Sequence, residues 1–168
     1  MTAPITRIAP DFALLKKTEF DNIIDVRSPS EFLDDHVPGA INLPVLDDSQ
    51  RAEIGRIYKQ INPFEAKRSG AALVAQNIAG YLQNDLAKKD RDWRPLIYCW
   101  RGGQRSGAMA KIFSDIGWHS AVIEGGYKSY RKAVLDDLDH LPAKFRLIVL
   151  SGPTGTAKTH ILRAAAQN

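Results

Sequence analysis

The single cysteine of the chain, Cys99, opens a run that combines a nucleophile with the parts of an anion-binding loop. The run follows an apolar segment at 95–98, which is typical of a buried strand, and leads into a helix-like segment from about 106 to 116. A strand end, a glycine turn and a helix N-terminus are therefore predicted to meet at this loop. The run reads Cys99-Trp100-Arg101-Gly102-Gly103-Gln104-Arg105-Ser106.

The surroundings of Cys99 favour its reactive, ionised form. Backbone N–H groups and the positive end of a helix dipole are expected near the sulfur, and Arg101 and Arg105 add two positive charges. Gly102 and Gly103 let the backbone take positive φ and turn its N–H groups inward. We predict that Cys99 is a catalytic nucleophile and that the rest of the run binds an anion. A buried structural cysteine is the alternative.

The composition is that of a soluble globular protein. The 168 residues are 44% hydrophobic and 25% charged, enough for one domain and part of another. The net charge of +4 is compatible with an RNA partner. On charge alone, an ordinary soluble surface is the favoured interpretation. A single cysteine excludes an intrachain disulfide and a cysteine-cluster metal site, and no metal is expected. With no signal-peptide core and no long apolar run, we expect a cytoplasmic protein without a membrane span.

Short apolar runs alternate with helical stretches, which predicts an α/β fold with a mainly parallel sheet flanked by helices. The segment at about 47–92 has no strand signal, so we predict a helical insertion between two core strands. Its basic residues form either an RNA-facing surface or an ordinary solvated helix face. Predicted strands cover 22–26, 40–43, 96–99, 120–123 and 146–150, and predicted helices cover 30–33, 50–59, 64–85, 106–116 and 127–138.

Three blocks together resemble the rhodanese family of sulfurtransferases. The first is DVRSPSEF at 25–32 followed by HVPGAINLP at 36–44, the second is the Cys99 loop, and the third is EGGY at 124–127 with Tyr130 after it. The resemblance implies a rhodanese-like domain over residues 1–141.

Several residues of the first block have physical roles apart from the resemblance. Asp25 and Arg27 follow a predicted strand, where a carboxylate and a guanidinium can pair or brace neighbouring loops and support the site. Ser28 or Ser30 can cap the following helix. His36 belongs to a turn motif rather than to the Cys99 loop, which indicates a structural role.

The spacing Cys-x5-Arg, from Cys99 to Arg105, is one residue longer than the loop common in single-domain rhodaneses. It resembles the loop of phosphatase members of the superfamily, so a Cys-x5-Arg phosphatase or an arsenate reductase is an alternative. The loop contains no carboxylate that would act as an obvious general acid, which argues against that alternative.

The loop sequence CWRGG-x-RS at 99–106 resembles more specifically the tRNA 2-selenouridine synthase family, in which a P-loop domain follows a rhodanese domain. Segments 55–60 and 62–66 of the insertion are also similar to that family. The resemblance implies that selenium replaces the 2-thio sulfur of a tRNA wobble uridine. Selenophosphate is the implied donor, and a geranylated intermediate makes geranyl diphosphate a second substrate. The implied partners are tRNA and an enzyme that supplies selenophosphate, and no tightly bound cofactor is implied.

By the same resemblance, Cys99 handles selenium as a perselenide or otherwise assists the exchange. The loop amides, Arg101 and Arg105 would hold selenophosphate or the leaving phosphate. Trp100 can stack on a base, with packing as the favoured alternative. A stand-alone thiosulfate-type sulfurtransferase and a non-catalytic module that binds RNA or a partner remain open.

Residues 142–168 are predicted to form a linker, a strand and a Walker A-like loop of a second domain. Gly152, Lys158 and Thr159 fit the motif Gly-x4-Gly-Lys-[Ser/Thr], and Gly155 matches an extra glycine often seen in such loops. Ala157 replaces the second glycine and is expected to impair the loop. Since nine residues follow Thr159, we expect a fragment or a truncated gene product that lacks the full activity and does not bind a nucleotide or diphosphate appreciably at Lys158.

Overall fold

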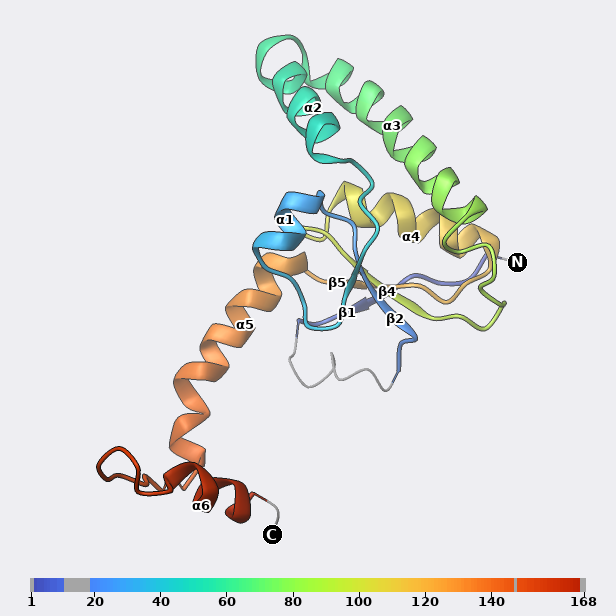
Figure 1. Ribbon diagram of the computed structural model, residues 1–168. Helices are drawn as coiled ribbons and strands as arrows, with labels where there is room; N and C mark the ends of the chain where they lie inside the picture. The colour runs from blue at the N-terminus through green and yellow to red at the C-terminus, as the bar shows by residue number, and fades with distance from the viewer. Residues whose placement is uncertain (1, 11–18, 147, 167–168) are drawn as a thin grey trace. The chain divides into compact units, whose positions relative to one another are not determined.

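The predicted α/β architecture is confirmed by a computed structural model, which describes residues 2–10, 19–146 and 148–166 (Figure 1). In this part of the chain, parallel strands form one sheet in the order β1-β5-β4-β2-β3. The strands are β1 (Thr6–Ile8), β2 (Asn22–Asp25), β3 (Ile41–Asn42), β4 (Pro95–Tyr98) and β5 (Ala121–Ile123). The helices are α1 (Pro29–Asp34), α2 (Asp48–Gln60), α3 (Pro63–Gln83), α4 (Gln104–Ile116), α5 (Gly126–His140) and α6 (Lys158–Ala165), with a 3-10 turn at Pro142–Lys144.

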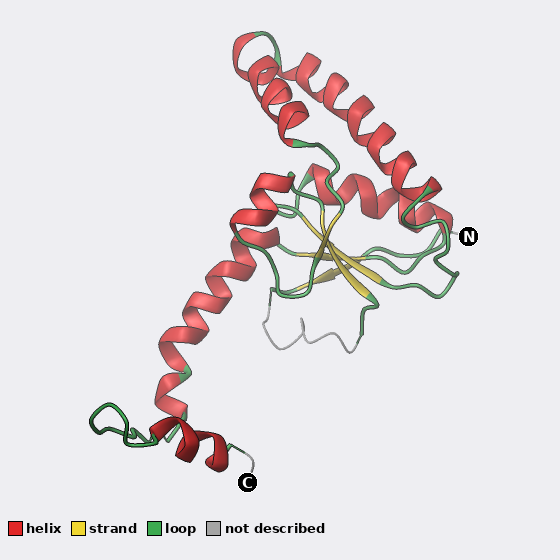
Figure 2. Cartoon of the chain, viewed as in Figure 1, coloured by secondary structure: helices red, strands yellow, loops and turns green. Residues whose placement is uncertain are grey.

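Successive side chains of β4 alternate between two hydrophobic layers, as strand geometry requires. Leu96 points into the layer that contains Tyr127 of α5, whereas Ile97 and Cys99 belong to the layer that contains Phe113 of α4. Helices therefore cover both faces of the sheet (Figure 2). This burial on both sides explains why the central strands read as continuous apolar runs. It also places Cys99 at the end of a fully buried strand.

The insertion between β3 and β4 consists of α2 and α3, which pack against each other as a helical hairpin (Figure 1). The Asp47 carboxylate accepts the N–H of Gln50 at 2.7 Å at the start of α2. The Asn62 side chain accepts the N–H of Phe64 at 2.7 Å at the start of α3, where Pro63 occupies the first turn. These caps are local in sequence, which is why both helices are predictable from it.

Sequence patterns do not predict the edge strand β1. Its residues pair with β5 in parallel register, with Thr6 opposite Ala121 and Ile8 opposite Ile123. A three-residue segment with Arg7 at its centre is too short and too polar to stand out as an apolar run. The neighbouring strand, rather than local propensity, decides that this segment is extended.

The predicted strand at 146–150 is wrong. Residues 146 and 148–150 have no regular secondary structure, and residue 147 lies outside the described residues. Ile148 and Val149 are 84% and 85% exposed. An apolar run becomes a strand only where another strand accepts its backbone hydrogen bonds, and 148–150 pair with none of the described residues.

The chain divides into two compact units, with the boundary after Leu135, inside α5. The domain boundary expected at 141/142 stays a prediction. None of the described helices is long and apolar enough to cross a membrane.

A buried ion pair anchors the loop that follows β2. Arg27 Nη2 lies 2.7 Å from Asp25 Oδ2, and both side chains are almost fully buried. Arg27 also donates to the backbone carbonyl of Asp35 at 2.6 Å, and its guanidinium lies 4.1 Å from the ring centroid of Tyr127. The pair therefore ties β2, the end of α1 and the start of α5 together.

Replacing Arg27 with leucine should lower the free energy of unfolding by about 3–5 kcal/mol, because the Asp25 carboxylate would be buried without its partner. Denaturant titration measures this change. The exposed pair of Arg56 with Glu53 supplies the control, since Arg56→Leu should leave stability nearly unchanged. Equal effects of the two substitutions would contradict the role of the buried pair.

Candidate active site

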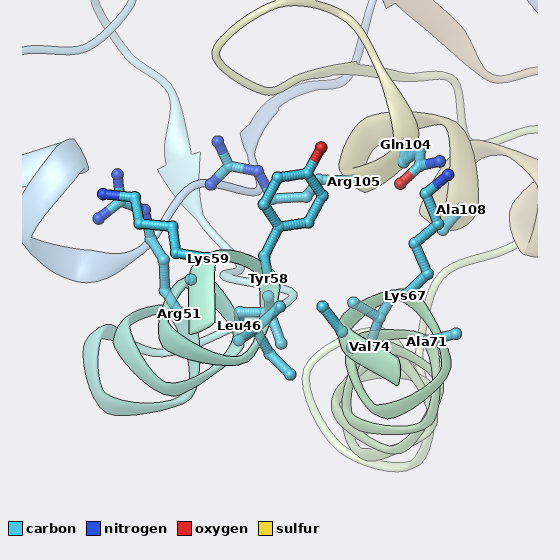
Figure 3. A pocket seen from close by; sticks show the side chains of 14 residues that line it. Leu46, Arg51, Tyr58, Lys59, Lys67, Ala71, Val74, Gln104, Arg105 and Ala108 are labelled. Atoms are coloured by element: carbon cyan, nitrogen blue, oxygen red, sulfur yellow. The ribbon is translucent and has the colours of Figure 1, made fainter. Parts of the chain in front are cut away.

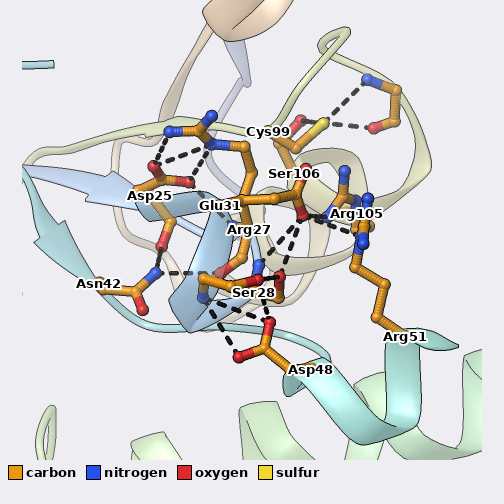
Figure 4. Close-up of polar contacts among 12 residues, drawn as sticks. Asp25, Arg27, Ser28, Glu31, Asn42, Asp48, Arg51, Cys99, Arg105 and Ser106 are labelled. Atoms are coloured by element: carbon orange, nitrogen blue, oxygen red, sulfur yellow. Dashed lines mark hydrogen bonds and ion pairs between the residues drawn. The ribbon is translucent and has the colours of Figure 1, made fainter. Parts of the chain in front are cut away.

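Cys99 lies directly after β4, and the loop that it opens ends where α4 begins at Gln104 (Figure 4). The Cys99 side chain is 3% exposed. Its Sγ accepts the backbone N–H of Gly103 at 3.3 Å and lies 3.2 Å from Ser106 Oγ. The strand end, the loop and the helix N-terminus thus meet around the sulfur.

These contacts favour the thiolate. Burial alone raises the pKa of Cys99, but the Ser106 hydroxyl and the N–H groups of Ser106, Gly103 and Arg101 donate toward the sulfur. The hydrogen bonds outweigh burial and hold the pKa of Cys99 below its ordinary value. A lowered thiol pKa is a property of reactive rather than structural cysteines.

The two loop arginines are placed differently from each other. Arg105 Nη1 donates to Glu31 Oε2 at 2.8 Å, and Arg51 Nε of α2 contacts the same oxygen at 3.0 Å. The Arg101 side chain is exposed and has no hydrogen-bond or ion-pair partner among the described residues. Hydrogen bonds, and not the arginine charges expected from the sequence, are therefore the main cause of the lowered Cys99 pKa.

Glu31 is a site residue that sequence reasoning did not single out. Burial opposes its ionisation, but the hydrogen bond and charge of Arg105, together with the charge of Arg51, lower its pKa. The carboxylate thus connects α1, the insertion and the cysteine loop. Its only local signal is its position in the first turn of α1, where Ser28 N–H donates to it at 3.3 Å. That signal indicates a helix cap, and Arg105 is too distant in sequence to suggest an ion pair.

The EGGY segment at 124–127 lies against the start of the Cys99 loop. The N–H groups of Tyr127 and Lys128 donate to the carbonyls of Cys99 and Trp100 at 2.8 and 3.0 Å. Gly126 has φ +63°, and a Cβ there would lie 2.2 Å from the Cys99 carbonyl oxygen. Only glycine permits this approach, which gives the third sequence block a physical reason.

The loop glycines and Trp100 are placed as follows. Gly102 uses the conformational freedom of glycine and takes φ +62°, whereas Gly103 has φ −100° and is the N-cap of α4. Gly103 contributes its N–H to the sulfur without a left-handed conformation. The half-buried Trp100 ring lies 5.8 Å from the Tyr127 ring and packs against the layer of α5, in agreement with the favoured alternative for this residue.

The other predicted site residues lie in the second compact unit. Gly152 and Gly155 have positive φ, and so does Ala157 (+55°), which a non-glycine residue adopts only at a cost of about 1 kcal/mol. Lys158 Nζ donates to the carbonyls of Gly152 and Pro153 at 2.7 and 2.6 Å and folds back over its own loop. Thr159 follows in the first turn of α6. The expected absence of nucleotide binding at this loop stays a prediction.

Comparison with known proteins gives one family. The rhodanese-like domain family matches residues 11–133. Proteins named tRNA 2-selenouridine synthase from Nitrosomonas europaea and Bdellovibrio bacteriovorus are 38% and 35% identical to this chain over 83% and 84% of it. The matches cover 37% and 38% of those two proteins, so the chain spans less than two fifths of their length.

Solved structures agree with the fold. A crystal structure of the N-terminal domain of a Clostridium difficile 630 protein named for ATP/GTP binding is 34% identical to the chain, with a TM-score of 0.64. The match covers 79% of this chain and 99% of that one. Reduced CoADR-RHD from Bacillus anthracis, 17% identical with a TM-score of 0.50, matches 79% of this chain and 17% of its own; it shows a likeness of fold alone.

Replacing Ser106 with alanine should raise the pKa of Cys99 toward the ordinary range of a thiol, because the thiolate loses a donor. The pH dependence of thiolate ultraviolet absorbance, taken as the difference from Cys99→Ser, measures the pKa. Ser114→Ala, on the same helix but away from the sulfur, is the control and should leave the pKa unchanged. An unchanged pKa in Ser106→Ala would contradict the role of this hydroxyl.

The lowered pKa also gives stability a pH dependence. The native state ionises Cys99 more readily than the unfolded chain, so this contribution is complete above the pKa of the unfolded thiol. It is lost as the pH falls to the native value. Wild type should therefore gain stability relative to Cys99→Ser as the pH rises through this window.

Gly126→Ala should destabilise the domain by about 3 kcal/mol, because the added Cβ meets the Cys99 carbonyl and positive φ is strained for alanine. Gly80→Ala in α3 is the matched control. A Cβ at Gly80 meets nothing within 4 Å, and helix propensity then favours alanine by about 0.8–1.0 kcal/mol. Thermal or denaturant unfolding measures both, and an unaffected Gly126→Ala variant would refute the close approach.

Proposed function

The chain belongs to the rhodanese-like domain family, and we propose that it transfers sulfur or selenium through Cys99 in the modification of tRNA. The main support is the hydrogen bonding around Cys99 Sγ. The Gly103 N–H lies 3.3 Å from the sulfur and Ser106 Oγ lies 3.2 Å from it. They favour a thiolate at the start of a loop in which Arg101 and Gln104 are exposed. The names of its relatives from two bacteria support the tRNA context.

The proposed step is attack of the Cys99 thiolate on a sulfane-type chalcogen. With thiosulfate, an S–S bond forms to the outer sulfur, the bond between the two thiosulfate sulfurs breaks, and sulfite leaves with the electron pair. With selenophosphate, an S–Se bond forms, the Se–P bond breaks and the electron pair stays on phosphorus, which takes a proton from water and leaves as phosphite. The second half-reaction passes the chalcogen to an acceptor. Because Cys99 is the chain's sole thiol, turnover must end on an external acceptor.

The loop supplies binding for an oxyanion next to the sulfur. Arg101 is exposed and unengaged by any described side chain, so its guanidinium is available to a phosphate or sulfite oxygen. Arg105 is held by its ion pair with Glu31. Gly103, between them in the sequence, is also exposed. We assign the loop to the anionic part of the donor and to the leaving group.

The proposed reaction is replacement of the 2-thio sulfur of a tRNA wobble uridine by selenium. Selenophosphate would be the donor and geranyl diphosphate a second substrate, through a geranylated thiouridine. The partners would be tRNA and an enzyme that supplies selenophosphate. The part of this conversion proposed for the present chain is chalcogen handling at Cys99, because the chain spans less than two fifths of its named relatives.

The contacts of Arg105 favour this proposal over phosphoester hydrolysis. A Cys-x5-Arg phosphatase needs its arginine on the phosphate and a carboxylic acid that protonates the leaving oxygen. Arg105 instead pairs with Glu31, and the lowered pKa of Glu31 keeps this carboxylate ionised.

Incubation with thiosulfate should add the mass of one sulfur atom to the wild-type chain and nothing to Cys99→Ser, since only the thiolate can form the S–S bond. Selenophosphate should likewise add one selenium atom. Intact-mass spectrometry detects both adducts. An assay for phosphite tests whether one phosphite is released for each selenium atom bound. Ser114→Ala is the control for buried serines on α4 and should load normally. Absence of both adducts would contradict a chalcogen carrier.

A further inference from the structure

A cavity of about 650 Å³ lies between α2 and α3, beside the N-terminal turn of α4 (Figure 3). Its volume is in the range of small-molecule sites. The chemistry proposed at Cys99 makes no use of it. One face of each hairpin helix lines it at helical spacing, with positions 51, 54, 55, 58 and 59 on α2 and 66, 67, 70, 71 and 74 on α3.

The interior of the cavity is apolar. Leu46 lies at its base, and Ile54, Tyr58 and Val74 contribute most of the remaining large side chains. Small residues keep the space between the helices open: a Cβ at Gly70 would already touch Ile54 at 3.5 Å. Transfer of a hydrocarbon group from water into this cavity is favourable, because it removes apolar surface from water. The lining offers few hydrogen-bonding partners to a polar ligand.

The rim of the cavity is cationic. Four of the fourteen lining residues are arginine or lysine, and none is acidic. Arg51 and Arg105 share Glu31, whereas Lys59 and Lys67 are exposed and have no hydrogen-bond or ion-pair partner among the described residues. Figure 3 shows these basic side chains around the opening, with the Tyr58 ring standing between them. An anionic group at this rim would meet uncompensated positive charge.

We propose that this cavity binds a small amphiphilic anion, with its hydrocarbon chain between α2 and α3 and its anionic group at the rim beside Lys59 and Lys67. The apolar interior is complementary to the hydrocarbon part of such a ligand, and the cationic rim is complementary to its anionic group. Alkyl phosphates and prenyl diphosphates both have this chemistry. A nucleic acid would meet the lysines but leave the apolar interior unused. Geranyl diphosphate, proposed above as a second substrate, is one member of this class, so the new element is the site itself. The inference is argued from the cavity and does not rest on chalcogen transfer at Cys99.

Calorimetric titration of the chain with decyl phosphate tests the proposal, below the concentration at which that probe aggregates. We expect saturable binding, weaker binding of 1-decanol and none of inorganic phosphate. Across a series of alkyl phosphates, each methylene that enters the cavity should tighten binding about fourfold. Geranyl diphosphate is titrated in parallel. Tighter binding than decyl phosphate would identify a prenyl donor as the ligand, and equal binding would support the wider class of amphiphilic anions.

Matched variants locate the site. Ala71 lines the cavity and its exposed neighbour Ala72 does not, so Ala71→Leu should weaken decyl phosphate binding at least tenfold while Ala72→Leu leaves it unchanged. Lys59→Ala and Lys67→Ala should each weaken it about threefold, as expected for exposed charges. Lys111→Ala on α4, outside the cavity, is their control.

Cys99→Ser should bind decyl phosphate as wild type does, so a failure of chalcogen loading and a failure of ligand binding are read separately. Absence of saturable binding, or binding that Ala71→Leu does not affect, would overturn the proposal. Equal affinity for 1-decanol would overturn the role of the cationic rim. Lysine variants that weaken tRNA binding, in a chain that does not bind decyl phosphate, would make this surface a nucleic-acid contact instead.

Discussion

The site depends on the close approach of two backbone segments, the Cys99 loop and the EGGY turn. Tyr127 and Lys128 donate their N–H groups to the carbonyls of Cys99 and Trp100, and Gly126 lies where any side chain would collide with the Cys99 carbonyl. These contacts hold one side of the loop through its carbonyls. N–H groups of the same loop donate toward the sulfur, where they outweigh the effect of burial on the pKa of Cys99.

A second constraint comes from charge. Glu31 places one carboxylate between Arg105 of the loop and Arg51 of the insertion, and the buried pair of Asp25 with Arg27 holds the preceding strand end. Together they link the helical hairpin to the cysteine loop through α1. The same arrangement leaves the Arg101 side chain exposed and without an ion-pair partner among the described residues. It also brings the cavity between α2 and α3 next to the loop, since Arg105 contacts both.

Much of the fold was predictable because its signals are local. The buried strands β2 and β4, the caps at Asp47 and Asn62 and the glycine turn after Cys99 each follow from a few adjacent residues. Strand prediction failed where the outcome depends on a neighbouring strand. The run at 148–150 is apolar but pairs with no described strand, whereas β1 is polar and short but is held extended by β5.

The sequence by itself determined the α/β class, the parallel sheet, the place of Cys99 after a buried strand and the glycine loop that follows it, because these depend on residue order and on the conformational freedom of glycine. Only the tertiary structure decided which groups act on the thiol. It separated the roles of two similar arginines, brought Glu31 to both Arg51 and Arg105, and formed an apolar cavity with a basic rim from faces of α2 and α3. Ion pairs and cavities join residues that lie far apart in the chain, and no local pattern in the sequence records which of them will meet.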